Sequence, residues 1–338
     1  MRNKQSFQVT QSAIITFMSI ISNCTASAIQ DAAQSLIAGN LVAFPTETVY
    51  GLGADACNKE AVARIYEVKG RPTDHPLIVH VSSIELLDKW ASDIPEYAIK
   101  LTKAFWPGPM TLVLPRTELA KNFTTGGQNN VALRIPSHPV ALELLKEFEK
   151  LGGLGVAAPS ANRFGKVSPT TALAVEIDLG EYLSNSDLIL DGGTSKVGVE
   201  STIINCTSEL PVILRPGGVT AEMIQEALEV ELDRGFAANK EIKVPGMFAS
   251  HYSPNAKIFL SGTPSPGDGF IALSHIPTPE KVIRLASPIN VKEYAQQLYS
   301  AFRLADSKRL KKVFVIPPTG KGLAIAVNDR LKKAAYDI

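Results

Sequence analysis

The chain has 338 residues, more than one hydrophobic core usually supports, and this length favours two domains. Apolar residues make up 45% of the sequence and charged residues 20%, which excludes a disordered or fibrous chain. The 34 Lys and Arg nearly balance the 33 Asp and Glu, so no bulk positive charge indicates general nucleic-acid binding.

The N-terminal segment has an apolar stretch, Ala13–Ile21, that follows a basic start and is too short to span a bilayer. We favour an N-terminal extension over residues 1–25 rather than a cleaved signal, and no other stretch is long and apolar enough for a membrane span. Cys24, Cys57 and Cys206 are far apart and form no CxxC pair, a pattern that fits a reducing compartment. These features predict a cytoplasmic protein.

The first domain begins with a helical pattern at Ser27–Ala38, and a buried strand follows at Leu41–Phe44. The strand leads into Pro45–Gly53, which we interpret as a polar, glycine-bearing functional turn. Further strands are predicted at 77–81, 110–114, 131–135, 155–158, 188–190, 202–205 and 212–214, and helices at 59–68, 84–90, 95–105, 139–150 and 220–229. Because some connections are hairpin-short, we expect a twisted, mixed sheet flanked by helices.

The sequence pattern changes after Glu229, where a stretch without helical or strand periodicity begins. Strand-like segments at 257–260, 269–273, 281–285 and 312–316 and helices at 291–305 and 322–335 then predict a small, parallel, Rossmann-like α/β domain. We therefore divide the chain into an extension (1–25), a catalytic domain (26–232), a linker (233–255) and a C-terminal domain (256–338).

Two cations lie two residues apart in the turn Lys69-Gly70-Arg71-Pro72, and we expect both on the surface, where they hold one phosphate chain. A solvated helix terminus is the alternative. A second polar segment, with Ser160 and Asn162, directly follows a predicted strand and is either a ligand site or a capped turn. In a third polar segment, Arg215 follows a predicted strand and precedes a glycine-containing turn, a position that is hard to explain for a core residue.

Several catalytic motifs are missing from the sequence. It has no phosphate loop of the GxxxxGKS or GxxxxGKT kind, no strand-turn-helix GxGxxG, no GxSxG elbow and no HExxH. The five histidines lie at no metal-ligand spacing, so we predict no protein metal site.

Taken together, ten segments in order closely resemble the YrdC-domain family of L-threonylcarbamoyladenylate synthases, in its longer, two-domain branch. They are PTETVYGLG at 45–53, KGRP at 69–72, HPLIVHV at 75–81, WPGPMTLVL at 106–114, VALRIPSHP at 131–139, APSAN at 158–162, SPT at 168–170, DGG at 191–193, GVESTI at 198–203 and LRPG at 214–217.

The resemblance implies an enzyme that converts L-threonine, bicarbonate and ATP to threonylcarbamoyl-AMP and pyrophosphate. The product would pass to a threonylcarbamoyl transferase complex for tRNA modification, with tRNA an indirect partner and Mg²⁺ the counter-ion of ATP. The catalytic set it implies is Lys69, Arg71, Ser160 and Asn162. The residues it implies for threonine are Thr48, His80, Arg134 and Ser201. The implied ATP contacts are Lys69, Arg71, His75, Asn130, Ser160, Asn162, Ser168, Arg215, His251 and Tyr252.

Position 75 departs from the family, because His stands here where many relatives have Asn; both side chains can donate a hydrogen bond. The linker carries His251 and Tyr252 among prolines and a glycine. We hypothesise that it is a lid that closes over ATP and keeps water from the mixed anhydride.

Two rival functions remain on the sequence alone. One is an RNA-binding module, which the near-zero net charge does not support. The other is a carbamoyl-transfer enzyme of the hydrogenase-maturation type, whose zinc-finger and acylphosphatase segments are absent from this sequence.

Overall fold

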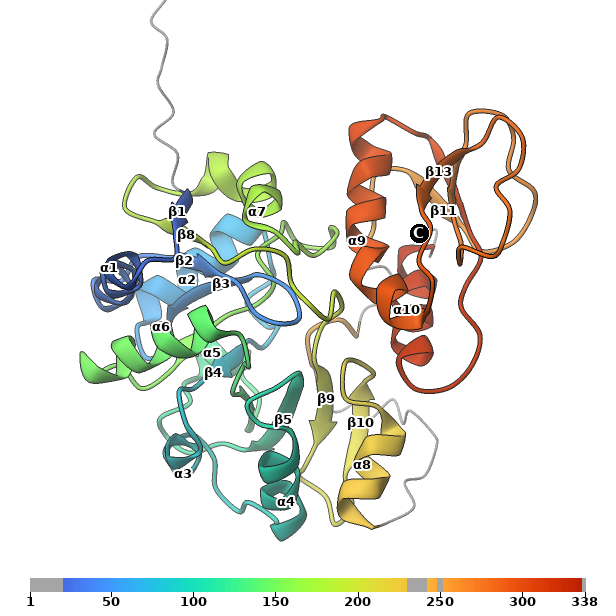
Figure 1. Cartoon of the computed structure of the whole chain (residues 1–338). Coiled ribbons are helices and arrows are strands. Elements are labelled where there is room, and N and C mark those ends of the chain that lie inside the picture. The colour runs from blue at the N-terminus through green and yellow to red at the C-terminus, as the bar shows by residue number, and fades with distance from the viewer. Residues whose placement is uncertain (1–20, 230–241, 248–251, 336–338) are drawn as a thin grey trace, which may run out of the picture.

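The computed structural model describes residues 21–229, 242–247 and 252–335. Two bodies lie side by side, one built on a ten-stranded sheet and the other on a four-stranded sheet (Figure 1). The described helices include none that is long and apolar enough to cross a membrane.

The larger sheet is mixed, with strand order β1-β8-β2-β3-β7-β4-β6-β5-β9-β10. Its strands are β1 (Ile21–Asn23), β2 (Val42–Phe44), β3 (Gly51–Asp55), β4 (Ile78–His80), β5 (Met110–Pro115), β6 (Asn130–Arg134), β7 (Val156–Ala157), β8 (Leu188–Asp191), β9 (Thr202–Asn205) and β10 (Val212–Arg215). The sheet contains parallel pairs such as β4 with β6 and antiparallel pairs such as β5 with β6, as the short connections predicted. Strand β1 lies within the segment expected as an extension and pairs in parallel with β8.

Helices cover both faces of this sheet. They are α1 (Ala26–Ile37), α2 (Lys59–Lys69), α3 (Leu87–Trp90), α4 (Glu96–Phe105), α5 (Asn122–Thr125), α6 (Pro139–Lys150), α7 (Ala172–Leu179) and α8 (Ala221–Leu228), with 3₁₀ turns η1 (Ile84–Leu86) and η2 (Gly180–Tyr182). Helices α1 and α6 share one core with β2 and β8, while α2, α4, α7 and α8 contribute to the core on the other face. Burial of these apolar stripes, more than helix propensity, holds the layers together.

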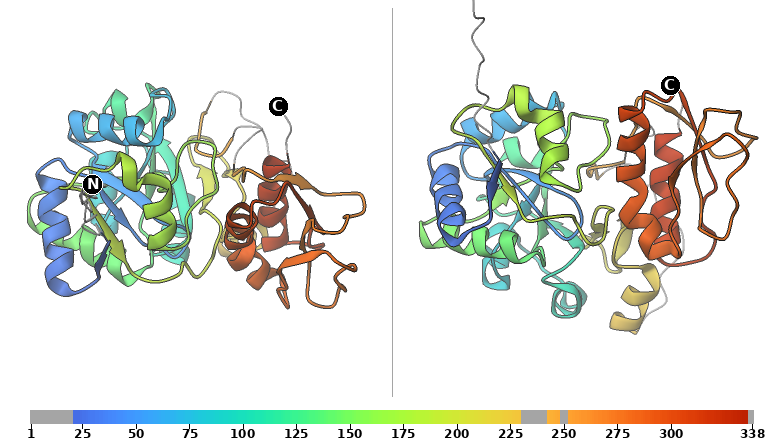
Figure 2. Two further views of the ribbon diagram at one scale, coloured as in Figure 1. Left: turned by 90° about the horizontal axis from the view of Figure 1, so that it is seen from above. Right: turned by 45° about the horizontal axis from the view of Figure 1, so that its top comes forward.

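The smaller sheet is entirely parallel, with order β11-β14-β12-β13. Its strands are β11 (Lys257–Phe259), β12 (Gly269–Ile271), β13 (Ile283–Ala286) and β14 (Lys312–Val315), and its helices are α9 (Val291–Ser307) and α10 (Leu323–Ala334). The two helices lie between this sheet and the first body (Figure 2). A mixed sheet flanked by helices and a small parallel α/β domain are both confirmed. The predicted domain boundaries stay predictions.

One segment differs from its prediction, because Gly51–Asp55 is strand β3 rather than the end of a functional turn. A Cβ on Gly53 would come within 2.8 Å of both Phe44 and Val156. The glycines here therefore allow close strand packing, which a sequence pattern does not separate from a turn.

The two bodies share a core that lies beside the candidate site. Val49, Val167 and Val199 of the first body pack with residues of α9 and α10. Gly198 has φ +81°, and a Cβ there would lie 2.4 Å from the Ala295 carbonyl oxygen of α9. This close approach brings the loop that precedes β9 directly against the C-terminal domain.

Candidate active site

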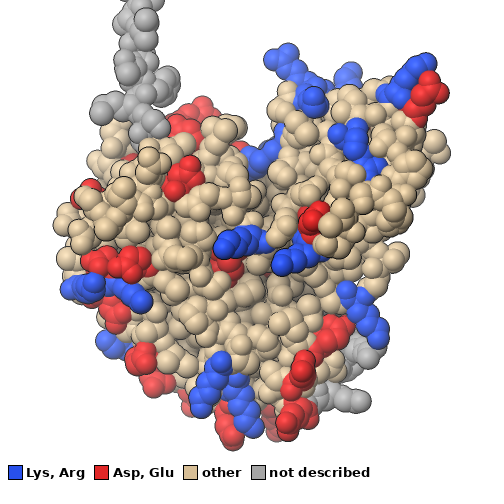
Figure 3. All heavy atoms as spheres, in the orientation of Figure 1, with Lys and Arg blue, Asp and Glu red and all other residues tan. Residues whose placement is uncertain are grey.

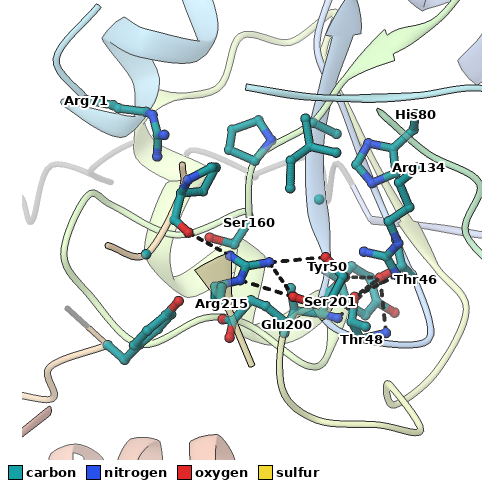
Figure 4. A pocket seen from close by; sticks show the side chains of 18 residues that line it. Thr46, Thr48, Tyr50, Arg71, His80, Arg134, Ser160, Glu200, Ser201 and Arg215 are labelled. Atoms are coloured by element: carbon teal, nitrogen blue, oxygen red, sulfur yellow. Dashed lines mark hydrogen bonds between the residues drawn. The ribbon is translucent and has the colours of Figure 1, made fainter. Parts of the chain in front are cut away.

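A pocket lies where loops of the first body meet the linker, beside the second body (Figure 4). It is lined by Thr46, Thr48, Val49, Tyr50, Gly51, Arg71, Ile78, His80, Arg134, Ala158, Pro159, Ser160, Glu200, Ser201, Arg215, Pro245, Gly246 and Tyr252. Eight of the predicted site residues are among them: Thr48, Arg71, His80, Arg134, Ser160, Ser201, Arg215 and Tyr252.

Arg134 lies at one end of the pocket, at the last position of β6. Its Nη2 donates to Glu47 Oε1 at 2.7 Å and to Thr48 Oγ1 at 3.0 Å, and its Nε donates to the Gly108 carbonyl at 3.3 Å. Within the described residues, no hydrogen bond occupies Nη1. A buried guanidinium held on one edge and unoccupied at the other can bind a small carboxylate.

His80, the last residue of β4, lies beside Arg134 and has its ring edge-on to Phe44, with the ring centroids 6.0 Å apart. Burial, together with the Arg134 guanidinium, lowers the pKa of His80 to about 3. The imidazole is therefore neutral at pH 7 and can either donate or accept a hydrogen bond.

Arg215 lies between the two ends of the pocket, at the last position of β10, and is buried. Its Nη2 donates to the Ser201 carbonyl at 2.9 Å and to Ser201 Oγ at 3.1 Å. Its Nη1 donates to the Pro245 carbonyl at 3.0 Å, which ties the linker to the pocket. The unusual position noticed in the sequence is thus a buried cation at the site.

Arg71 lies at the other end of the pocket, away from Arg134 (Figure 4). Its Nη2 donates to the Pro76 carbonyl at 2.9 Å, and its guanidinium lies 5.9 Å from the Phe164 ring centroid. Burial lowers the pKa of Arg71 to about 10, so the side chain stays charged at neutral pH. The expectation of a solvated surface turn is wrong, because Arg71 is only 8% exposed.

Lys69 is also buried, with 2% of its surface exposed, and does not line the pocket. Its Nζ donates to the Ser160 carbonyl at 2.5 Å and to the Asn162 carbonyl. Burial and the neighbouring Arg71 hold the pKa of the ammonium well below its usual range. In this structure Lys69 holds the loop that carries Ser160, and a direct phosphate contact stays a prediction.

The Asn162 amide nitrogen donates to the carbonyls of Arg163 and Lys166, at 2.7 and 2.8 Å. Its Oδ1 is buried without a hydrogen-bond partner among the described residues. Ser168 is buried outside the pocket lining, and its Oγ donates to Glu200 Oε1 at 2.6 Å. Both side chains thus support loops next to the pocket.

Besides Lys69, Asn162 and Ser168, two more of the predicted ATP residues that the structure describes do not line the pocket. His75 is buried against Phe164, with the ring centroids 5.3 Å apart. Asn130, at the first position of β6, pairs with Pro115 of β5. His251 lies outside the described residues.

Sequence reasoning missed two carboxylates that organise the pocket. Glu47 stands beside Thr48 in the first motif and pairs with Arg134. Glu200 stands beside Ser201 and receives a hydrogen bond from Arg330 Nε at 2.7 Å. Both glutamates lie inside quoted motifs, and an acidic residue in a motif could have indicated a role at the site. Nothing in the sequence indicated that Glu200 contacts Arg330.

A pocket with three buried arginines among hydroxyls, on loops of a mixed α/β sheet, is typical of an enzyme that binds anionic small molecules. Comparison with known protein families shows to which family of such enzymes the chain belongs. Residues 34–217 match the Sua5, YciO and YrdC family model, described as "Telomere recombination", and residues 219–336 match the threonylcarbamoyl-AMP synthase C-terminal domain. The chain belongs to the threonylcarbamoyl-AMP synthase family.

Curated relatives agree over nearly the whole chain. The threonylcarbamoyl-AMP synthase of Pyrococcus abyssi is 40% identical, with 88% of this chain and 91% of that protein covered. The Bacillus subtilis enzyme of the same name is 40% identical over 91% of this chain and 92% of its own length. A crystal structure of P. abyssi Sua5 complexed with L-threonine matches with a TM-score of 0.83 and 38% identity, covering 93% of this chain and 97% of that one. The resemblance found in the sequence is confirmed.

Proposed function

We propose that this chain makes L-threonylcarbamoyl-AMP and pyrophosphate from L-threonine, bicarbonate and ATP. The observation that carries the proposal is one pocket with two chemically distinct ends (Figure 4). Arg134, His80 and Thr48 suit a small zwitterion with a carboxylate and a hydroxyl. Arg71 at the other end, with Arg215 and Ser160 between the two ends, suits a phosphate chain.

In the proposed reaction the threonine amine and bicarbonate first form a carbamate with loss of water. A carbamate oxygen then attacks the α-phosphorus of ATP, the bond to the β-phosphate breaks, and pyrophosphate leaves. No covalent enzyme intermediate is needed. The protein contributes position and charge: Arg134 orients threonine, while Arg71 and Arg215 stabilise charge on the phosphates.

Mg²⁺ was expected as the counter-ion of ATP. The described residues contain no cluster of three or more His, Cys, Asp or Glu that could hold a metal ion. Among the residues that the structure describes, the one carboxylate that lines the pocket is Glu200, and it already accepts hydrogen bonds from Ser168, Tyr299 and Arg330. These residues do not fit a dedicated magnesium site, so we assign the ion no protein ligand and derive no step through it.

Pyrophosphate release is the most direct test of the reaction. We expect the purified protein to release pyrophosphate from ATP only when threonine and bicarbonate are both present. Omitting either one should reduce release to background, as measured with a coupled phosphate assay. Release that depends on neither substrate would overturn the proposed reaction. A carbamoyl-transfer enzyme would instead require carbamoyl phosphate.

The linker contributes Pro245, Gly246 and Tyr252 to the pocket lining, which supports its assignment as a lid over ATP. Lys243 is exposed next to buried Val244, so trypsin can report on this segment. We expect ATP with threonine to slow tryptic cleavage after Lys243, measured by mass spectrometry of the fragments. Cleavage after exposed Lys59 should be unchanged. Equal rates after Lys243 with and without ligands would reduce the linker to a tether.

The transferase complex, tRNA as an indirect partner and the cytoplasmic location stay predictions. The RNA-binding alternative gains no support from the face shown in Figure 3, where Lys and Arg are interspersed with Asp and Glu.

A further inference from the structure

A buried ion pair joins the C-terminal domain to the pocket. Arg330, on α10, is 0% exposed, and its Nε donates to Glu200 Oε2 at 2.7 Å. Glu200 lies in the loop before β9, next to the predicted threonine residue Ser201, and lines the pocket. The partners are 130 positions apart in the chain, so only the docking of the two bodies brings them together.

Two hydroxyl groups complete the surroundings of the Glu200 carboxylate. The Tyr299 hydroxyl, on α9, donates to the Glu200 carboxylate, and its oxygen lies 3.1 Å from Oε1 and 3.0 Å from Oε2. Ser168, which belongs to the first body, donates its hydroxyl to Glu200 Oε1 at 2.6 Å. Both carboxylate oxygens are thus engaged, and two of the three donors come from the C-terminal domain.

Arg330 also contacts two segments that border the ATP end of the pocket. Its Nη2 donates to the Pro216 carbonyl at 3.0 Å, directly after Arg215. Its guanidinium lies 5.1 Å from the ring centroid of Tyr252 in the linker. Tyr252 in turn stacks on Tyr299, with the centroids 5.8 Å apart. One arginine therefore touches Glu200, the turn after β10 and the linker.

The charge of Glu200 explains why this arrangement matters for an anionic substrate. Burial alone would raise the pKa of Glu200, but Arg330 and Arg215 outweigh it and hold the pKa at about 2. The carboxylate is therefore ionised at neutral pH. A buried negative charge beside a triphosphate site repels the substrate unless a fixed cation neutralises it. Besides Arg330, the cation that lowers the pKa of Glu200 is Arg215, which the phosphates need.

We propose that Arg330 and Tyr299 are positioning residues for the ATP half of the active site. They hold and neutralise Glu200, so that Arg215 stays available to the phosphates and Tyr252 is kept over the pocket. The inference rests on the proposed function, and it makes the C-terminal domain a structural part of the site. It assigns no contact between Arg330 and substrate.

The test is steady-state pyrophosphate formation by the full chain carrying R330M, Y299F or E200Q, or both R330M and E200Q. We expect R330M to raise the KM for ATP by roughly tenfold or more, with the KM for threonine changed less than about twofold. Y299F should raise the KM for ATP less, because Ser168 and Arg330 still hold the carboxylate. Adding E200Q to R330M should restore part of the ATP affinity, since the unpaired negative charge is then gone.

Asp178→Asn is the matched control, because Arg303 of α9 pairs with Asp178 across the same interface at 2.6 Å, away from the pocket. This variant should lower the melting temperature without changing the KM for ATP. Should R330M fail to fold, Y299F and the double variant decide the question in its place.

Equal increases in both KM values, no rescue by E200Q, or the same KM change in Asp178→Asn would overturn the inference and leave a purely structural interface. Wild-type protein that releases no pyrophosphate from ATP, threonine and bicarbonate would instead contradict the proposed function. The two failures are therefore distinguishable.

Discussion

Replacing Arg134 with methionine is expected to raise the KM for threonine by roughly 10- to 150-fold while the KM for ATP changes little. The range corresponds to a lost charged hydrogen-bonded contact of about 1.5 to 3 kcal/mol. Arg134 lies at the opposite end of the pocket from Arg71, and its hydrogen bonds go to Glu47, Thr48 and the Gly108 carbonyl. Initial rates at varied threonine and varied ATP measure the two constants separately.

Glu47 supplies the control for this experiment. Removing Arg134 leaves the Glu47 carboxylate buried without its 2.7 Å partner, which by itself destabilises the fold. The double variant R134M with E47Q removes that charge, so we expect it to recover thermal stability but not threonine affinity. If the double variant uses threonine normally, Arg134 acts only by pairing with Glu47. Equal losses for threonine and ATP would also place Arg134 outside the threonine contacts.

Replacing Lys69 with methionine is expected to lower both stability and activity. Replacing a cation on the surface would instead leave the stability unchanged. The buried ammonium donates to the carbonyls of Ser160 and Asn162, and methionine leaves both carbonyls without that donor. The Ser160 carbonyl keeps a hydrogen bond from the Asn162 backbone N–H, but the Asn162 carbonyl loses its donor, and we expect a net loss of about 2 kcal/mol. For a chain of 338 residues that is a fall in melting temperature of roughly 3 °C. Differential scanning calorimetry measures it.

Lys100 is the matched control, since its side chain is 57% exposed and its one ion pair within the described part of the chain is with Glu96. Lys100→Met should leave both the melting temperature and the rate unchanged within error. If Lys69→Met keeps its melting temperature but loses activity, the ammonium acts on the phosphates, as the family resemblance implied. If it keeps both, Lys69 has no role in holding the loop.

Much of the fold followed from local patterns. Helices such as Pro139–Lys150 and strands such as Met110–Pro115 match their predicted positions within a residue, because an amphipathic period or an apolar run is a property of neighbouring residues. Strand Gly51–Asp55 was not predicted, since a segment with two glycines is also typical of a turn. Helix Ala172–Leu179 was not predicted either. Its exposed face carries Leu173 and Ile177, which hides the helical period.

The sequence by itself determined the family and eight of the 18 residues that line the pocket, because nearly all of those eight lie inside short motifs whose order along the chain identifies them. The tertiary structure alone decided what each side chain does there. It buried Lys69 and Arg71 under loops that come from distant positions, and it placed Arg330 against Glu200. Lys69 is buried by the loop of Ser160 and Asn162 in its own domain, and Arg330 meets Glu200 only when the two bodies dock. Burial and charge pairing thus depend on segments far apart in the chain, so no local pattern carries that information.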